Sequence, residues 1–276
     1  MRLKARRRIG GSLDSDRRRA VGAPPGASSP VRVIEPATSS AFVGAAADWV
    51  CDHLGAAPSS VLALPTGNTP LGLYAELISR SRAGAVRLDR ARIFNLDEYC
   101  GLGPANPHSF ACYLQRHLIS PLDLRPAHIR LLRGDAADIA LECRDYDAAL
   151  ADCRGIDLCV LGLGANGHLA FNEPGTPWDI RTHVADLSES TRAAQRRPVP
   201  PHQAQYGWKV PERGVTMGIA TLLEARHILL LIAGAGKVAA AAALYRGVPS
   251  IDWPVTSLVG HPSLTVIQLG ELAEHQ

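Results

Sequence analysis

Several features that would define other classes of protein are missing from this 276-residue sequence. No apolar run approaches the ~18 residues that a membrane-spanning helix needs. The six cysteines form no C-x-x-C pair, so we expect reduced thiols rather than disulfides or a zinc site. No Walker A loop and no cluster of metal ligands is present, and Arg6-Arg7-Arg8 precedes a polar stretch rather than the apolar segment of an export signal. These absences predict a cytoplasmic protein that spans no membrane and needs no metal or organic cofactor.

The net charge of +3 is unevenly distributed along the chain. Residues 1–30 carry eight Arg or Lys and two Asp, which leaves the remaining chain at −3. We expect residues 1–30 to be a disordered basic extension, more plausibly a dispensable tail than a site for an anionic partner. Residues 31–270 have globular composition and no internal repeat, so they are expected to form a single domain without a nucleic-acid partner.

Apolar runs alternate with helical periodicity along this domain. Strands are expected at 31–34, 60–64, 91–95, 129–132, 156–161, 225–233 and 261–267. Helices are expected at about 39–54, 71–80, 110–118, 135–153, 218–224, after 237 and at 253–258, whereas the chain after 174 reads as polar and irregular. The alternation predicts an α/β fold with a doubly wound, mostly parallel, Rossmann-like sheet.

The most informative stretch is IDLCVLGLGANGHLAFNEP, at residues 156–174. A buried strand runs into glycine-rich turns, and His168 and Glu173 follow directly. Open α/β sheets bind their ligands just past the carboxyl ends of their strands. Taken alone, the motif fits a tight turn with a loop histidine about as well as it fits a catalytic site.

A second strand–turn–helix junction lies at residues 65–70, with the sequence PTGNTP. The free N–H groups of a helix N-terminus favour an anion, and hydroxyl groups would add donors. The candidate ligands are Thr66, Gly67, Asn68 and Thr69. An ordinary βα turn with Thr69 as the helix N-cap fits the same residues equally well.

Three segments together resemble the glucosamine-6-phosphate deaminases. GLGANGHLAFNEP resembles the active-site signature of that family, LPTGNTPLGLY its sugar-phosphate loop, and Asp97-Glu98-Tyr99 its DEY motif. The resemblance covers about residues 31–267. It implies that His168, backed by Asn166 and Glu173, opens the sugar ring, and that Asp97 moves a proton between sugar carbons 2 and 1. Some members have Asp at the position of Asn166, and Glu98 is expected to play a structural part.

Two basic residues complete the implied phosphate site. Lys237 lies in the first turn of a helix after a buried strand, where a lysine favours phosphate, and it matches the family's phosphate-binding lysine. Arg197 matches the arginine that reaches the substrate phosphate. The sequence departs from the family directly after it, at Pro198, and the loop to residue 210 is longer than usual and typical of a lid.

The implied reaction converts glucosamine 6-phosphate and water into fructose 6-phosphate and ammonia. Three alternatives stay open: another amino-sugar phosphate such as galactosamine 6-phosphate, a 6-phosphogluconolactonase, and a non-enzymatic sugar-phosphate sensor. The lactonases typically have DER in place of Asp97-Glu98-Tyr99 and lack the FNEP glutamate. The resemblance also implies a phosphosugar as the small-molecule partner and a possible homo-oligomer.

Overall fold

A computed structural model describes residues 31–122, 124–195 and 208–270 of the chain. The basic extension at 1–30 and Arg197 therefore lie outside the described residues.

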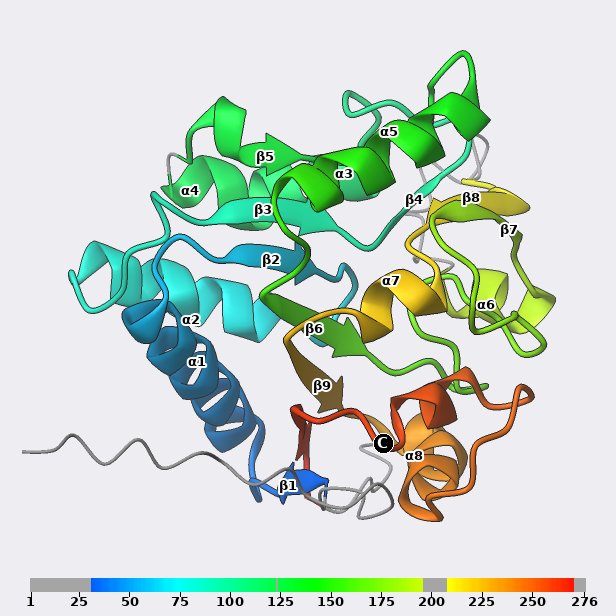
Figure 1. Cartoon of the computed structure of the whole chain (residues 1–276). Coiled ribbons are helices and arrows are strands. Elements are labelled where there is room, and N and C mark those ends of the chain that lie inside the picture. Colours follow the sequence, from blue (N-terminus) through cyan, green and yellow to red (C-terminus); the bar gives the residue numbers. More distant parts are fainter. Residues whose placement is uncertain (1–30, 123, 196–207, 271–276) are drawn as a thin grey trace, which may run out of the picture.

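A seven-stranded sheet forms the centre of the molecule (Figure 1). The strand order is β1-β10-β9-β6-β2-β3-β5, and every neighbouring pair is parallel. Its strands are β1 (Arg32–Ile34), β2 (Val61–Leu64), β3 (Arg92–Asn95), β5 (Ile129–Arg130), β6 (Leu158–Gly162), β9 (His227–Ile232) and β10 (Leu264–Gln268). The apolar runs of the sequence become strands because both faces of a parallel sheet are covered. The expected parallel sheet is confirmed.

Helices cover both faces of this sheet, as a doubly wound fold requires. One face packs against α1 (Ser39–Ala56), α2 (Leu71–Arg82), α3 (Phe110–Leu114), the π-helical turn Gln115–Ile119 and α4 (Ser120–Leu122). The other face packs against α5 (Ile139–Asp152), α7 (Ile219–Leu223), α8 (Val238–Tyr245) and the 3₁₀ segment Pro254–Leu258. The two apolar clusters thus lie on opposite sides of one sheet.

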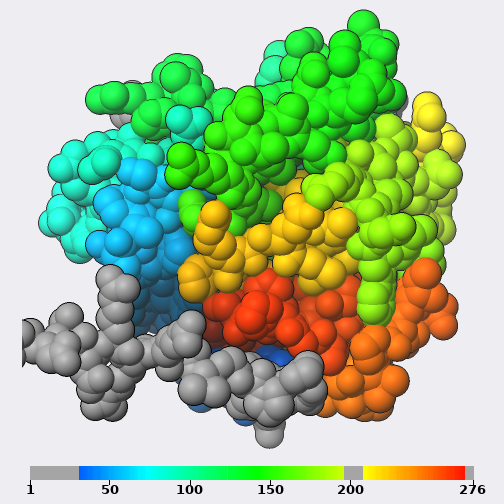
Figure 2. All heavy atoms as spheres, viewed as in Figure 1, coloured from blue at the N-terminus to red at the C-terminus, as the bar shows by residue number. Residues whose placement is uncertain are grey.

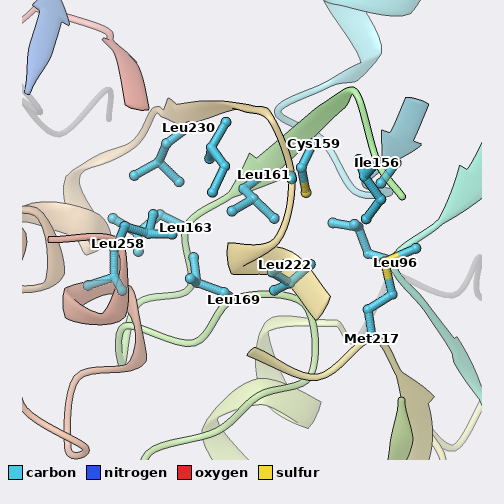
Figure 3. Close-up of a cluster of buried hydrophobic side chains, with 14 of the residues drawn as sticks. Leu96, Ile156, Cys159, Leu161, Leu163, Leu169, Met217, Leu222, Leu230 and Leu258 are labelled. Atoms are coloured by element: carbon cyan, nitrogen blue, oxygen red, sulfur yellow. The ribbon is translucent and has the colours of Figure 1, made fainter. Parts of the chain in front are cut away.

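The cluster on the α5 side continues beneath the loop that contains His168 (Figure 3). Leu161 and Leu230 come from neighbouring strands, and Leu163 and Leu169 bracket the glycine-rich turn. Each fully buried leucine stabilises the fold by about 1.5–3 kcal/mol relative to an exposed one. The turn is therefore anchored in the core on both sides.

A separate three-stranded antiparallel sheet was not expected from the sequence. Its strands are β4 (Asp97–Tyr99), β8 (Arg213–Thr216) and β7 (His183–Asp186), in the order β4-β8-β7. β7 and the short helix α6 (Glu189–Ala194) lie in the region expected to be irregular, so that expectation is wrong for residues 183–194. In Figure 1 this small sheet lies beyond the arrowheads of the large one.

The helix limits differ slightly from the sequence expectation. Helix α5 begins at Ile139 rather than near Asp135, because the Asp138 side chain accepts the N–H of Leu141 and caps the helix. The helix N-cap after the 65–70 turn is Pro70, which offers no side-chain cap, so the alternative of Thr69 as N-cap is wrong.

All six cysteines are free, and no helix in the described ranges is long and apolar enough to cross a membrane. The space-filling view shows the gold segment that contains α7 packed between the green α5 region above and the red C-terminal segment below (Figure 2).

Candidate active site

Four neighbouring strands deliver the predicted site residues to one edge of the large sheet. The register pairs Leu64 with Asn95 and Gly162 with Leu231, so β2, β3, β6 and β9 end close to one level. The loops that follow them carry the 65–70 turn, Asp97, His168 and Lys237. The chain order reverses between β6 and β2, the point at which open α/β sheets bind ligands.

Two glycines shape the turn around His168. A Cβ atom on Gly164 would lie only 2.3 Å from Nδ1 of the His168 ring, so a side chain there would displace the imidazole. Gly167 has φ +85°, and the Trp253 ring packs against it, so a Cβ there would lie 2.8 Å from that ring. The glycines therefore permit both the left-handed turn and the position of the imidazole.

The Asn166 amide connects His168 with Glu173. Its Nδ2 donates to Glu173 Oε2 at 2.7 Å, and its Oδ1 accepts the backbone N–H of His168 at 3.2 Å. These two contacts fix the amide orientation. The His168 Nδ1 atom lies 2.7 Å from the same Oδ1, so Nδ1 must carry the proton. The other ring nitrogen, Nε2, then has a free lone pair and no hydrogen bond to the described residues.

Ser188 and Thr191 of the α6 N-terminus complete this chain of contacts. The Ser188 N–H and hydroxyl both donate to Glu173 Oε1 at 3.2 Å. The Thr191 hydroxyl oxygen lies 3.2 Å from His168 Nδ1, as a second and longer contact of the ring N–H. The sequence motifs gave no indication that these two hydroxyl residues belong to the site. A Ser-x-x-Thr sequence at a helix start signals only a cap, and its contact with His168 depends on the tertiary fold.

His168 is held in its neutral form. Burial is the largest cause that lowers the pKa of the imidazole; the negative charge of Glu173 opposes the shift, the positive charge of Lys237 adds to it, and the resulting pKa is about 4. A neutral imidazole with a free Nε2 can accept a proton at neutral pH.

Asp97 and Glu98 are adjacent residues with different surroundings. Glu98 Oε1 accepts the N–H groups of Tyr99 and Phe110, and Oε2 accepts that of Ala111, so its carboxylate caps the N-terminus of α3. The expected structural part of Glu98 is thereby confirmed. The Asp97 carboxyl is 7% exposed and receives no hydrogen bond from the described residues.

The two acids therefore titrate differently. Burial raises the pKa of Glu98 to about 7, and its three N–H donors oppose that rise. Burial, and next the charge of Glu98, raise the pKa of Asp97 to about 8. Because only Glu98 has N–H donors, Glu98 ionises first and Asp97 keeps its proton to higher pH.

The 65–70 turn presents unused backbone donors. Gly67 has φ +102°, and the amides of Gly67, Asn68 and Thr69 make no backbone hydrogen bond within the described chain. The Tyr74 hydroxyl donates to the Pro65 carbonyl, and the Tyr113 hydroxyl donates to that of Gly67 at 2.6 Å. The two tyrosine hydroxyl groups thus fix the carbonyl groups of the turn and leave its N–H groups available, as an anion site requires. Thr66 is half-buried in the same turn.

Lys237 ends a 3₁₀ turn that follows β9 and precedes α8. Burial lowers the pKa of its ammonium group, and no carboxylate among the described residues pairs with it. Its charge reaches His168, which places it on the same side of the sheet edge. The structure thus brings Asn166, His168 and Glu173 into direct contact and places Lys237 nearby. The described residues contain no group of His, Cys, Asp or Glu arranged to hold a metal ion.

Comparison with known proteins identifies the family. Residues 37–266 match the model of the glucosamine-6-phosphate isomerases and 6-phosphogluconolactonases. The chain belongs to this family. Among its relatives, a glucosamine-6-phosphate deaminase of Geobacillus sp. (strain WCH70) is 39% identical over 86% of this chain and 92% of its own length. Glucosamine-6-phosphate deaminase 2 of Bacillus subtilis (strain 168) is 38% identical over 78% of this chain and 86% of its own.

Solved structures of the family agree with the fold. A monomeric glucosamine-6-phosphate deaminase superimposes with a TM-score of 0.82 at 36% identity, covering 88% of this chain and 98% of the other. The 6-phosphogluconolactonase from Thermotoga maritima gives a TM-score of 0.65 at 20% identity, covering 87% and 99%, which shows a shared fold only. Within the family, the deaminases are thus much more similar to this chain in sequence.

Proposed function

We propose that this protein is a glucosamine-6-phosphate deaminase, which converts glucosamine 6-phosphate and water into fructose 6-phosphate and ammonia. The observation that carries the proposal is the Glu173–Asn166–His168 chain, which leaves Nε2 of His168 free to handle a proton. Relatives that carry this name are 38–39% identical over most of the chain, which supports it.

The phosphate group binds at the 65–70 turn in this proposal. The free amides of Gly67, Asn68 and Thr69 donate to its oxygens, with the Thr66 hydroxyl beside them. Lys237 adds a positive charge that no carboxylate among the described residues neutralises. Arg197 stays a predicted phosphate ligand outside the described residues.

His168 opens the ring. Its free Nε2 accepts the proton of the hydroxyl on carbon 1 and returns a proton to the ring oxygen, which breaks the ring bond. Asn166 and Glu173 are positioning residues here, because they fix the tautomer without touching the sugar. Thr191 and Ser188 support the same arrangement from α6.

Asp97 then moves a proton along the open chain. Its ionised carboxylate takes the proton from carbon 2 while the substrate ammonium group gives a proton to the oxygen on carbon 1, which forms an enolamine. Asp97 then returns its proton to carbon 1. The product is an imine at carbon 2, which water hydrolyses to the ketose and ammonia. The positively charged amino group of the substrate favours ionisation of the buried Asp97 on binding. No step needs a cofactor.

The alternatives are weaker on the residues present. The 6-phosphogluconolactonase from Thermotoga maritima is only 20% identical, and the intact Asp97, His168 and Glu173 argue against a sensor without catalysis. Galactosamine 6-phosphate stays a possible substrate, because the loop after Arg197 lies outside the described residues. A homo-oligomer and a cytoplasmic location stay predictions; the structural relative described as monomeric favours a monomer.

The test is ammonia release from glucosamine 6-phosphate, with fructose 6-phosphate detected by a coupled assay. Wild type should release both products, and Asp97→Asn should lower kcat by about a hundredfold or more, because the amide cannot carry the proton. Asp52→Asn, on the exposed surface of α1, is the matched control and should retain full activity.

Galactosamine 6-phosphate and 6-phosphogluconolactone are assayed in parallel. Hydrolysis of the lactone without ammonia from either amino sugar would overturn the proposal in favour of a lactonase. Turnover of the galacto isomer alone would keep the chemistry and change the substrate.

A further inference from the structure

A polar cavity lies at the opposite edge of the large sheet from the candidate active site. It has a volume of about 310 Å³ and is lined by Ser59, Asp89, Arg90, Arg92, Arg125 and His128. These residues lie directly before or at the amino ends of β2, β3 and β5, on the left of Figure 1. None of them belongs to the site described above. We call this cavity the basic bowl.

The basic bowl gathers three arginines that form no ion pair within the described residues. Arg90, Arg92 and Arg125 are exposed and form no ion pair with a carboxylate of the described chain. Arg92 only donates to the Cys153 sulfur at 3.3 Å. Many other arginines of the described chain do have such partners, for example Arg80 with Asp48 and Glu76, Arg130 with Glu142, and Arg226 with Asp157. Three unpaired guanidinium groups in one concavity repel one another unless an anion joins them.

The one carboxylate in the basic bowl is already engaged. Asp89 receives two hydrogen bonds from Arg87, from Nε at 3.1 Å and from NH2 at 2.8 Å. The Arg87 guanidinium holds the pKa of Asp89 below its usual range, so this carboxyl is ionised. The lining contains three guanidinium groups and one carboxylate, so it carries an excess of positive charge that suits a doubly charged anion.

His128 is the remaining ionisable residue of the lining. Its Nδ1 atom is buried and has no hydrogen-bond partner among the described residues, which is unusual for a polar atom in a folded protein. His128 ends the 3₁₀ segment Pro126–His128 that carries Arg125 into the cavity wall.

From these observations we infer that the basic bowl binds the phosphate group of a small phosphorylated metabolite. Guanidinium forks match the oxygens of phosphate in pairs, and the Ser59 hydroxyl supplies a further donor. The cavity volume lies at the lower end of small-molecule sites, which suits a phosphate with a short attached group. The arginines converge on one cavity of this volume, which favours a small ligand over a nucleic acid.

The experiment follows backbone amide NMR shifts of the full chain during titration with inorganic phosphate. Amides of residues 59, 89–92 and 128 should move together and saturate, separately from those of residues 66–69. The Arg92→Gln/Arg125→Gln double variant should weaken phosphate binding at the basic bowl at least tenfold, with the shifts at 66–69 unchanged. Arg82→Gln/Arg116→Gln, which removes two exposed arginines elsewhere, should bind as wild type does.

Three outcomes would overturn the inference. Amides of the basic bowl that do not move, or equal weakening in the double variant and its control, would show that no site exists there. Loss of all binding at about 0.15 M salt would mean an adventitious ion only. Saturable binding of a single-stranded oligonucleotide without binding of phosphate would assign the surface to nucleic acid. None of these readouts depends on catalytic turnover, so failure here is separable from failure of the deaminase proposal.

Discussion

The large parallel sheet and the small antiparallel sheet contribute different parts of the candidate site. Loops of the large sheet supply anion donors, namely the amides of the 65–70 turn and Lys237. The small sheet holds the groups that would move protons. Asp97 lies on β4, and the His168 loop is fastened to β8 through the N–H of Phe171, which donates to Thr216 Oγ1 at 3.2 Å.

This division means that substrate binding and proton transfer depend on different supports. The Asn172 side chain fastens the same loop to the small sheet, since its Nδ2 donates to the Met217 carbonyl at 2.8 Å. The α6 residues that contact Glu173 and His168 follow directly on β7. Changes to the small sheet or to the His168 loop fastened to it should therefore alter kcat, and changes in the 65–70 turn or at Lys237 should alter KM.

Removing the Asn166 side chain should have the largest effect in this comparison. Asn166→Ala leaves Nδ1 of His168 without its shorter acceptor and Glu173 without its amide donor. We expect kcat to fall by about 10–100-fold, with KM changed little, as for other residues that orient a catalytic group. Steady-state kinetics with glucosamine 6-phosphate measures both constants.

A matched variant on α6 tests how the loss of kcat depends on which contact of His168 is removed. Thr191→Val removes the longer 3.2 Å contact to His168 and the acceptor of the Ser188 hydroxyl at 3.1 Å, but it keeps the shape of the side chain and the Asn166 contact, so kcat should fall only a few-fold. A Thr191→Val loss as large as that of Asn166→Ala would contradict the assigned hydrogen-bond order.

Lys237→Met tests the other half of the comparison. The change keeps most of the side-chain length and removes the charge, so KM should rise about tenfold, the loss of roughly one charge-assisted hydrogen bond, with kcat largely retained. A fall in kcat at unchanged KM would place Lys237 among the proton-moving groups instead. Thermal unfolding checks that the variant is folded.

Glu98→Gln should give the smallest effect, which is a shift in the pH dependence of kcat/KM. With the pKa of Asp97 raised to about 8, kcat/KM of wild type should rise with pH as Asp97 ionises. Glu98→Gln removes the neighbouring charge but keeps an oxygen for the Tyr99 and Phe110 N–H groups. The midpoint should then move to lower pH, only part of the way because burial is the larger cause.

The pH profile of kcat/KM distinguishes Asp97 from His168 as the group whose ionisation limits activity. Burial lowers the pKa of His168 to about 4, so His168 cannot produce a limb near pH 8. A midpoint that stays in place or rises in Glu98→Gln would contradict the coupling between the two carboxyl groups.

Periodicity and apolar runs sufficed to predict the large sheet, because strands buried on both faces are strongly apolar. HILLLI at residues 227–232 is such a run. They could not reveal the small sheet. Its strands DEY, HVAD and RGVT contain charged residues rather than an apolar run, and β4 begins two residues after β3 ends. DEY looks like a turn in sequence, and its pairing with β8 joins residues more than a hundred positions apart.

The candidate site shows the same limit. Motifs indicated Asp97, His168 and Glu173, because these residue types stand next to glycine-rich turns at strand ends. They could not indicate that Glu173 reaches His168 through the Asn166 amide, with Ser188 and Thr191 as a second set of contacts. Such a relay is a property of distances across a folded loop.

The fixed tautomer of His168 leaves the imidazole only one nitrogen, Nε2, that can accept and release a proton. Because Asn166 occupies Nδ1, any proton that enters at Nε2 must also leave there. The ring cannot pass protons from one side of the site to the other, as a histidine in a proton wire does. In the proposed ring opening, the site therefore holds the same number of protons before and after the reaction, and this step needs no proton exchange with solvent.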